Sequence, residues 1–190
     1  MQLNTRATRR GLTAAAMTGA ALLIPAIALA APGRPAAPAA AAPPHCPTTA
    51  LTAWLGVPGN GYAGGAGYQL ELSNISHQAC TLYGYPGVSA LGGGSVQLGS
   101  AATRVASHPN QLITLNPGAT AHVELRITNV GNYPSSACHP ANAVALRVYP
   151  PNDYTATEIP FSFRACAKSG PAFLHVTTTL NGTGIPGFSA

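Results

Sequence analysis

Charged residues are scarce in this 190-residue chain, at 7% of the sequence, against roughly 25% in an average soluble domain. No segment beyond residue 30 shows the 3.6-residue hydrophobic period of an amphipathic helix, which excludes a helical bundle. Three of the nine Lys and Arg residues lie within the first ten positions, and the other six are scattered without forming a cluster. The sequence therefore lacks the basic surface that nucleic-acid binding requires. The length of the chain allows one ordinary domain.

The motifs of common catalytic sites are missing as well. The nucleophile motif G-x-S-x-G is absent, and the glycine-rich stretch 58–67 lacks the Lys-Ser/Thr pair of a phosphate-binding loop. The only acidic residues are Glu71, Glu124, Asp153 and Glu158. Nothing in their spacing brings two of them together as a catalytic pair. We expect each to be a solvated or hydrogen-bonded surface carboxylate.

Histidines and cysteines show no spacing typical of a metal site. No two cysteines form C-x-x-C, and no two histidines form H-x-H or H-x-x-x-H. We therefore expect no metal, no cofactor and no catalytic residue. A small secreted metal-dependent enzyme that uses surface histidines is the alternative hypothesis. The six histidines are His45, His77, His108, His122, His139 and His175.

The first 30 residues have the features of an export signal. Arg6, Arg9 and Arg10 precede an uncharged apolar run, and Ala28-Leu29-Ala30 supplies the small residues before a cleavage site. A transmembrane anchor is the alternative, because the run approaches the minimum spanning length. We expect cleavage after Ala30, a secreted, extracellular protein and no stable membrane insertion. Residues 31–44, almost wholly Ala and Pro, predict a semi-extended linker.

Residues 45–180 predict a single β-sandwich domain, followed by a flexible Gly-rich tail at 181–190. Short segments with alternating apolar and polar residues are separated by Gly, Pro and Asn, as in antiparallel sheets. Each strand buries one face, so two sheets must pack together to form a core. The expected strands are 49–55, 68–73, 80–82, 88–91, 96–98, 103–106, 113–115, 121–128, 144–148, 159–163 and 173–179.

Four cysteines behind an export signal predict two disulfides. The sequence allows three pairings. We favour Cys46–Cys80 and Cys138–Cys166, because each closes a loop within one half of the domain. A loop of about 30 residues corresponds to roughly 3–4 kcal/mol of stabilisation in the chain-entropy model.

Tyrosines are the candidate ligand contacts. Exposed tyrosines make adaptable contact surfaces at a low entropy cost. We predict such contacts from Tyr62, Tyr133 and Tyr154, which lie in expected loops. Tyr83 and Tyr85 are instead expected to pack in or across the sandwich, with their hydroxyls hydrogen-bonded.

The stretch 80–88, C-T-L-Y-G-Y-P-G-V, resembles the central motif of a secreted actinobacterial family, domain of unknown function 4232. The resemblance covers nearly all of residues 46–179. It implies an all-β, immunoglobulin-like antiparallel β-sandwich with two disulfides, located outside the membrane, and it implies no activity. The other matching features are Cys46, the Gly-Ala stretch 64–67, the strand 70–74, Pro117-Gly118, Cys138 and Cys166.

Together these features predict an exported, non-enzymatic module that binds or spaces something in the cell envelope or the extracellular medium. The expected partner is a polysaccharide or another protein. Nothing in the sequence identifies that ligand or indicates nucleic-acid binding.

Overall fold

The computed structural model describes residues 41–56 and 61–185. The predicted signal at 1–30, most of the linker and the last five residues of the predicted tail lie outside the described residues. Within the described residues, no helix is long and apolar enough to cross a membrane.

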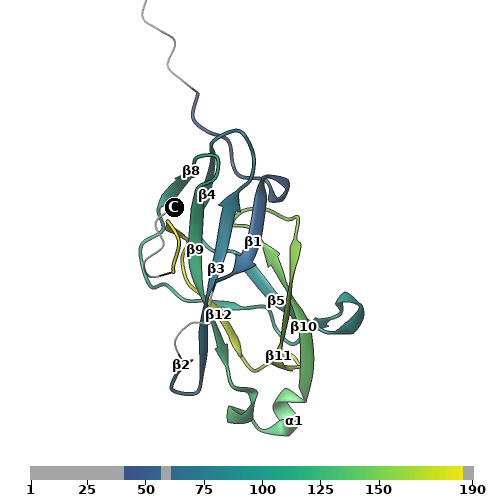
Figure 1. Cartoon of the computed structure of the whole chain (residues 1–190). Coiled ribbons are helices and arrows are strands. Elements are labelled where there is room, and N and C mark those ends of the chain that lie inside the picture. The colour runs from purple at the N-terminus through teal and green to yellow at the C-terminus, as the bar shows by residue number, and fades with distance from the viewer. Residues whose placement is uncertain (1–40, 57–60, 186–190) are drawn as a thin grey trace, which may run out of the picture. The chain divides into compact units, whose positions relative to one another are not determined.

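The larger sheet is built on two long central strands, β3 and β9, which pair in antiparallel register from Gly65↔Thr128 to Ser73↔Thr120 (Figure 1). β1 flanks β3, while β12 flanks β9 and pairs in parallel with β7. Among the described residues this sheet has seven strands: β1 (Leu51–Leu55), β2 (Gly61–Tyr62), β3 (Gly65–Asn74), β7 (Thr103–Arg104), β9 (Thr120–Thr128), β12 (Leu174–Val176) and β13 (Leu180–Asn181).

A second sheet has the strand order β11-β10-β5-β6 and is antiparallel throughout. A separate antiparallel pair of strands, β4 and β8, contains the first four residues of the 80–88 motif. The strands are β4 (Cys80–Tyr83), β5 (Gly87–Leu91), β6 (Gln97–Leu98), β8 (Leu112–Leu115), β10 (Pro140–Tyr149) and β11 (Thr157–Cys166). The short helical turns are η1 (Thr48–Ala50), η2 (Gly93–Ser95), η3 (Val130–Asn132) and α1 (Ser135–Cys138).

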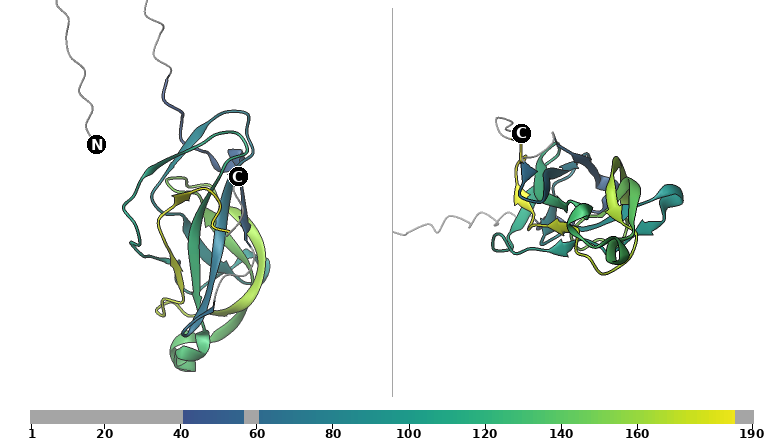
Figure 2. Two further views of the ribbon diagram at one scale, coloured as in Figure 1. Left: turned by 60° about the vertical axis from the view of Figure 1, so that its left-hand side comes forward. Right: turned by 90° about the horizontal axis from the view of Figure 1, so that it is seen from below.

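The core lies between the two sheets, which face each other in the turned views (Figure 2). Alternate residues of β3 and β9 point into it, as the period-2 pattern predicts. Leu70 and Val123 come from the larger sheet, Val88 and Leu146 from the smaller one, and all four are buried. The prediction of an all-β antiparallel sandwich is confirmed, apart from the one parallel pair.

Both predicted disulfides are present. Cys46–Cys80 fastens the start of the domain to β4, and Cys138–Cys166 joins the end of α1 to the end of β11. All four cysteines are buried, and no free cysteine remains. Stability therefore rests on two crosslinks as well as on the apolar core.

Two segments differ from the sequence-based expectation. In the glycine-rich stretch 58–67, expected to be a flexible connection, residues 61–67 form a hairpin between β2 and the start of β3. Residues 181–185, placed by the sequence in a flexible tail, make specific contacts: β13 pairs with β9, and the Ile185 side chain lies against the backbone just after β1. Tail residues with no alternating pattern can still be held by backbone hydrogen bonds, which leave no signal in the sequence.

Candidate functional site

A hollow of about 490 Å³ lies where the 80–88 motif meets the end of β10. Three tyrosines line it, Tyr85 from the 80–88 motif and Tyr149 and Tyr154 from the end of β10 and the loop after it, together with one arginine. Its lining residues are Tyr85, Gly87, Arg104, Tyr149, Pro150, Asn152, Asp153 and Tyr154.

The backbone brings these tyrosines together through a tight turn after β4. Gly84 takes a φ of 94°, a left-handed conformation that glycine adopts without a steric penalty. The chain then re-enters the smaller sheet at Gly87, which pairs with Tyr149 at the end of β10. A Cβ at Gly87 would lie 3.4 Å from the Tyr149 side chain, so the two pack closely. The guanidinium carbon of Arg104 lies 5.8 Å from the centre of the Tyr85 ring, within range of a cation–π contact.

Asp153 fixes the loop that carries Asn152 and Tyr154. Its Oδ2 accepts hydrogen bonds from the Thr48 backbone N–H and Oγ1, both at 2.7 Å, and its Oδ1 accepts from the Thr155 N–H at 3.0 Å. These donors favour the ionised form. The hydrogen bonds from Thr155 and Thr48 lower the pKa of Asp153 to about 2. The carboxylate is thus an anchor for the loop, with both oxygens occupied.

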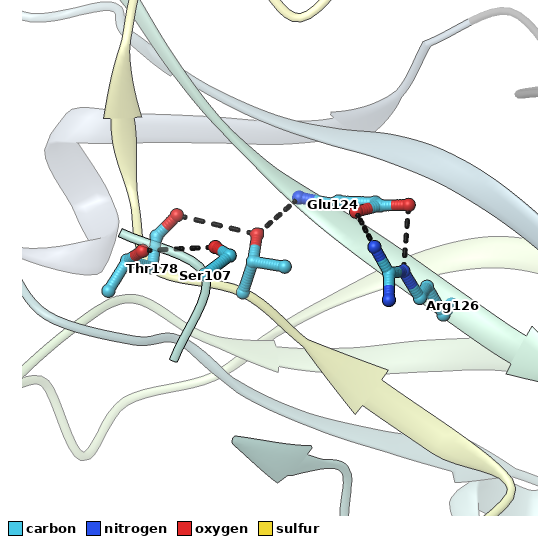
Figure 3. A network of polar contacts seen from close by, with 5 residues as sticks. Ser107, Glu124, Arg126 and Thr178 are labelled. Carbon is cyan, nitrogen blue, oxygen red and sulfur yellow. Dashed lines mark hydrogen bonds and ion pairs between the residues drawn. The ribbon is translucent and has the colours of Figure 1, made fainter. Parts of the chain in front are cut away.

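A second, polar hollow of about 260 Å³ lies on the outer face of the larger sheet. Beside it, Glu124 holds Arg126 through two hydrogen bonds of 2.8 Å, and its N–H donates to Thr177 Oγ1 at 2.9 Å. The chain of polar contacts continues to Thr178 and Ser107 (Figure 3). The residues lining the hollow are Gln69, Ser107, His108, His122, Glu124, Arg126, Thr177 and Leu180.

The three tyrosines predicted as contacts lie in different settings. Tyr154 is 96% exposed and lines the tyrosine hollow. Tyr62 lies on β2 with its hydroxyl 3.4 Å from Thr128 Oγ1. Tyr133 packs against the core, and its hydroxyl donates to the Ala172 carbonyl at 2.8 Å. The structure therefore brings only Tyr154 of the three into this hollow.

Two predictions about burial are wrong. Tyr83 is 47% exposed instead of packing in the sandwich, because it points outward from the small β4–β8 sheet, opposite the exposed Leu112. Glu71 points away from the core, as the alternation predicts, and it accepts a hydrogen bond, but it is fully buried instead of lying at the surface. The cause is the C-terminal segment, which crosses the outer face of the sheet above it and donates the Gly184 N–H to Glu71 at 3.1 Å.

Two of the six histidines, His108 and His122, line the polar hollow together. His45 contacts the Pro151 carbonyl at 2.6 Å, while His122 contacts the Gly182 carbonyl at 2.8 Å. Within residues 41–56 and 61–185, no three His, Cys, Asp or Glu side chains could together hold a metal ion. No observation in the structure favours the alternative of a histidine-based enzyme.

Sequence reasoning missed Arg104, Tyr149 and Asn152 as members of the hollow. The available signal was the turn P-P-N-D-Y at 150–154, which marks a loop at the end of a strand. The position of this loop next to the 80–88 motif depends on the pairing of β5 with β10. The sequence of neither strand indicates that they pair.

A family model, Domain of unknown function (DUF4232), matches residues 46–180. The match covers more than half of the chain, so the chain belongs to this family. The match includes the whole two-disulfide sandwich and the tyrosine hollow. A comparison with curated proteins finds no match.

Proposed function

We propose that this member of the DUF4232 family is an exported, non-enzymatic module that binds a polysaccharide of the cell envelope or medium. The observation that carries the proposal is the tyrosine-lined hollow. Tyrosine rings offer flat apolar faces that stack on the C–H faces of sugar rings, and their hydroxyls hydrogen-bond at the edge. Arg104 and Asn152 add polar groups beside the three rings. A concave site with aromatic walls and a few polar groups is typical of a binding pocket.

Export is supported by the N-terminal signal pattern and by the two disulfides. Disulfides persist in oxidising compartments and are rare in the cytosol. Both bonds are buried and join parts of the chain that also meet through backbone hydrogen bonds, such as Cys46 N–H to the Thr81 carbonyl at 2.9 Å. They fit the role of structural crosslinks in an extracellular protein.

A binding role is favoured over catalysis by the state of the only carboxylate in the hollow. A general acid or base works best with a pKa near the working pH. Asp153, with its pKa lowered to about 2, is ionised at neutral pH, and its oxygens already accept hydrogen bonds from Thr48 and Thr155. Its role is to hold Tyr154 and Asn152 in place.

The proposal is tested by co-sedimentation of the purified exported chain with insoluble peptidoglycan, cellulose and chitin. We expect retention on at least one of them and a loss of about fivefold or more in affinity for Tyr154→Ala, since stacking on one aromatic ring contributes about 1 kcal/mol or more. Tyr62→Ala is the matched control, because Tyr62 is also exposed but does not line the hollow.

The proposal fails if none of the three polysaccharides retains the protein. It also fails if Tyr62→Ala weakens retention as much as Tyr154→Ala. A third variant, Asp153→Asn, removes the anchor of the loop without removing a ring. We expect it to weaken retention less than Tyr154→Ala does.

A further inference from the structure

Glu71 is the fully buried carboxyl group of this domain, and the binding proposal does not use it. It lies on the outer face of β3, where alternation places polar side chains in water. Residues 182–185, here called the C-terminal strap, exclude that water. The Gly182 carbonyl contacts His122 Nδ1 on β9 at 2.8 Å, and the Gly184 N–H donates to Glu71 Oε1 on β3 at 3.1 Å. Ile185 then reaches the backbone just after β1.

The strap and the sheet fit closely at Gly184, where a side chain would require its neighbours to shift. A Cβ there would overlap Gln69 Oε1 and would lie 2.8 Å from His122 Cδ2. Gly184 therefore lies directly over three side chains of the sheet, those of Gln69, Glu71 and His122. Glycine at this position lets the backbone itself seal the polar face.

Two acceptor atoms under the strap have no donor. Among the described residues, neither Glu71 Oε2 nor Gln69 Oε1 has a hydrogen-bond partner, and both atoms are buried. A buried ionised carboxylate with one free oxygen is costly, and a group in that position tends to neutralise itself. A proton on Oε2 removes the charge and turns one of these two unpartnered acceptors into a donor.

The groups facing Glu71 do not supply a full counter-charge. Directly across β9 lies His122, whose Nδ1 must carry a proton to donate to the Gly182 carbonyl. Across β1 lies Trp54, which is uncharged. Glu124, further along β9, is neutralised by Arg126. The strap itself contains only Gly, Thr and Ile.

We propose that Glu71 is a protonated carboxylic acid in the closed protein and that its ionisation releases the C-terminal strap from the sheet. The O–H proton passes to water, and the carboxylate left behind is hydrated only if residues 182–185 move away. Opening uncovers Gln69, Glu71 and His122 beside the polar hollow. The strap is thus a pH-sensitive cover on the outer face of the larger sheet.

The direction of the pH dependence follows from the burial. Burial raises the pKa of Glu71 above its usual value, and the Gly184 N–H and His122 offset only part of that rise. A carboxyl group with a raised pKa in the closed state stabilises closure at pH values below its ordinary pKa. That contribution is lost as the pH rises through the pKa of the closed state. The strap is therefore closed in acid and opens toward higher pH.

Trp54 provides the measurement, because it is the only tryptophan in the chain and pairs across the sheet with Glu71. We expect its fluorescence to titrate with a midpoint above the ordinary carboxyl value, in the direction that burial shifts the pKa of Glu71. The Gly184 amide signal in NMR should move with the same midpoint. Glu71→Gln, which keeps the shape and removes the ionisable proton, should abolish both transitions and keep the strap closed.

Two further variants separate the possible causes. Glu124→Gln changes another outward carboxyl on the same face and should leave both transitions in place. His122→Gln should shift the midpoint without abolishing it, since His122 is a neighbour of the titrating group. If the transitions survive Glu71→Gln and vanish in His122→Gln, the imidazole is the switch and the proposal is overturned. A Glu71 side-chain NMR titration at the ordinary carboxyl value would overturn it as well.

Gly184→Ala provides a test that changes no charge. The added methyl group would overlap the Gln69 and His122 side chains, so these side chains or the strap must shift and the contact between strap and sheet should loosen at every pH. The midpoint of the Glu71 NMR titration should then fall back toward about 4.3. A midpoint unchanged from the wild type would show that the strap does not set the protonation of Glu71.

Discussion

Removal of the Cys138–Cys166 disulfide by the double substitution Cys138→Ala and Cys166→Ala should cost about 3.5–4.5 kcal/mol of unfolding free energy. The bond spans 28 residues, and closing a loop of that length in the unfolded chain corresponds to roughly 3.6 kcal/mol in the chain-entropy model. Both cysteines are fully buried, so the space left by two sulfur atoms adds up to about 1 kcal/mol. The total is a large share of the 5–15 kcal/mol typical of a domain.

The folded state should survive this change with its geometry intact. The Lys168 N–H donates to the Cys138 carbonyl at 3.1 Å, and the Ala167 N–H donates to the His139 carbonyl at 3.0 Å. These bonds hold the same two ends of the chain together without the sulfur atoms. The cost should therefore appear chiefly in the unfolded state, which gains freedom and exposes more surface when the crosslink is removed.

Urea unfolding followed by Trp54 fluorescence measures the effect. We expect a lower midpoint, a slightly steeper dependence on urea than in the wild type, and a melting temperature lower by roughly 10–14 °C. A loss below about 1 kcal/mol, with the wild-type bond verified by mass spectrometry, would refute the loop-entropy reasoning. The Cys46–Cys80 bond, which spans 34 residues, should give a similar loss when removed in the same way.

Three other substitutions test single contacts. Asn74→Ala removes a buried side chain whose Nδ2 donates to the Gln78 and Leu115 carbonyls at 2.8 and 2.9 Å, so urea unfolding should show a loss of about 2–4 kcal/mol. Gly99→Ala places a Cβ at a φ of 61° and 2.6 Å from a backbone carbonyl oxygen, and calorimetry should show a lower melting temperature by roughly 3–8 °C. Asp153→Asn should destabilise the protein at pH 6, because the pKa of Asp153 is lowered to about 2. The stabilisation that the ionised carboxylate provides is present above the ordinary pKa of an aspartate and is lost as the pH falls through about 2. The melting temperatures of the two proteins should therefore converge as the pH approaches that value.

Much of the fold could be predicted because it is written in local patterns. Alternation along residues 68–73 and 121–128 identifies the two central strands and their inward faces, and Leu70 and Val123 are buried as expected. The disulfide pairing could be favoured for a related reason, since each bond closes a loop within one half of the domain. Local periodicity and short loops are properties that a single sequence carries.

The candidate site was less predictable because it is assembled across the fold. Tyr154 was identified from its loop, yet Tyr149 and Arg104 were not, since their convergence depends on which strands become neighbours. Alternation predicted the face on which Glu71 lies but not its burial. An alternating pattern distinguishes the face of a strand that points into the core from its outer face. It does not indicate whether a distant segment of the chain covers that outer face.

The sequence by itself thus indicated the main strands, their inward faces, a favoured cysteine pairing and the signs of export, all of which depend on nearby residues or on residue type. Only the tertiary structure decided that three tyrosines share one hollow and that the C-terminal strap lies over β9 and β3. Contacts of this kind depend on backbone hydrogen bonds and close packing between segments far apart in the chain. In the case of Gly184 and Glu71, 113 residues separate the two partners, and neither one indicates the other in the sequence.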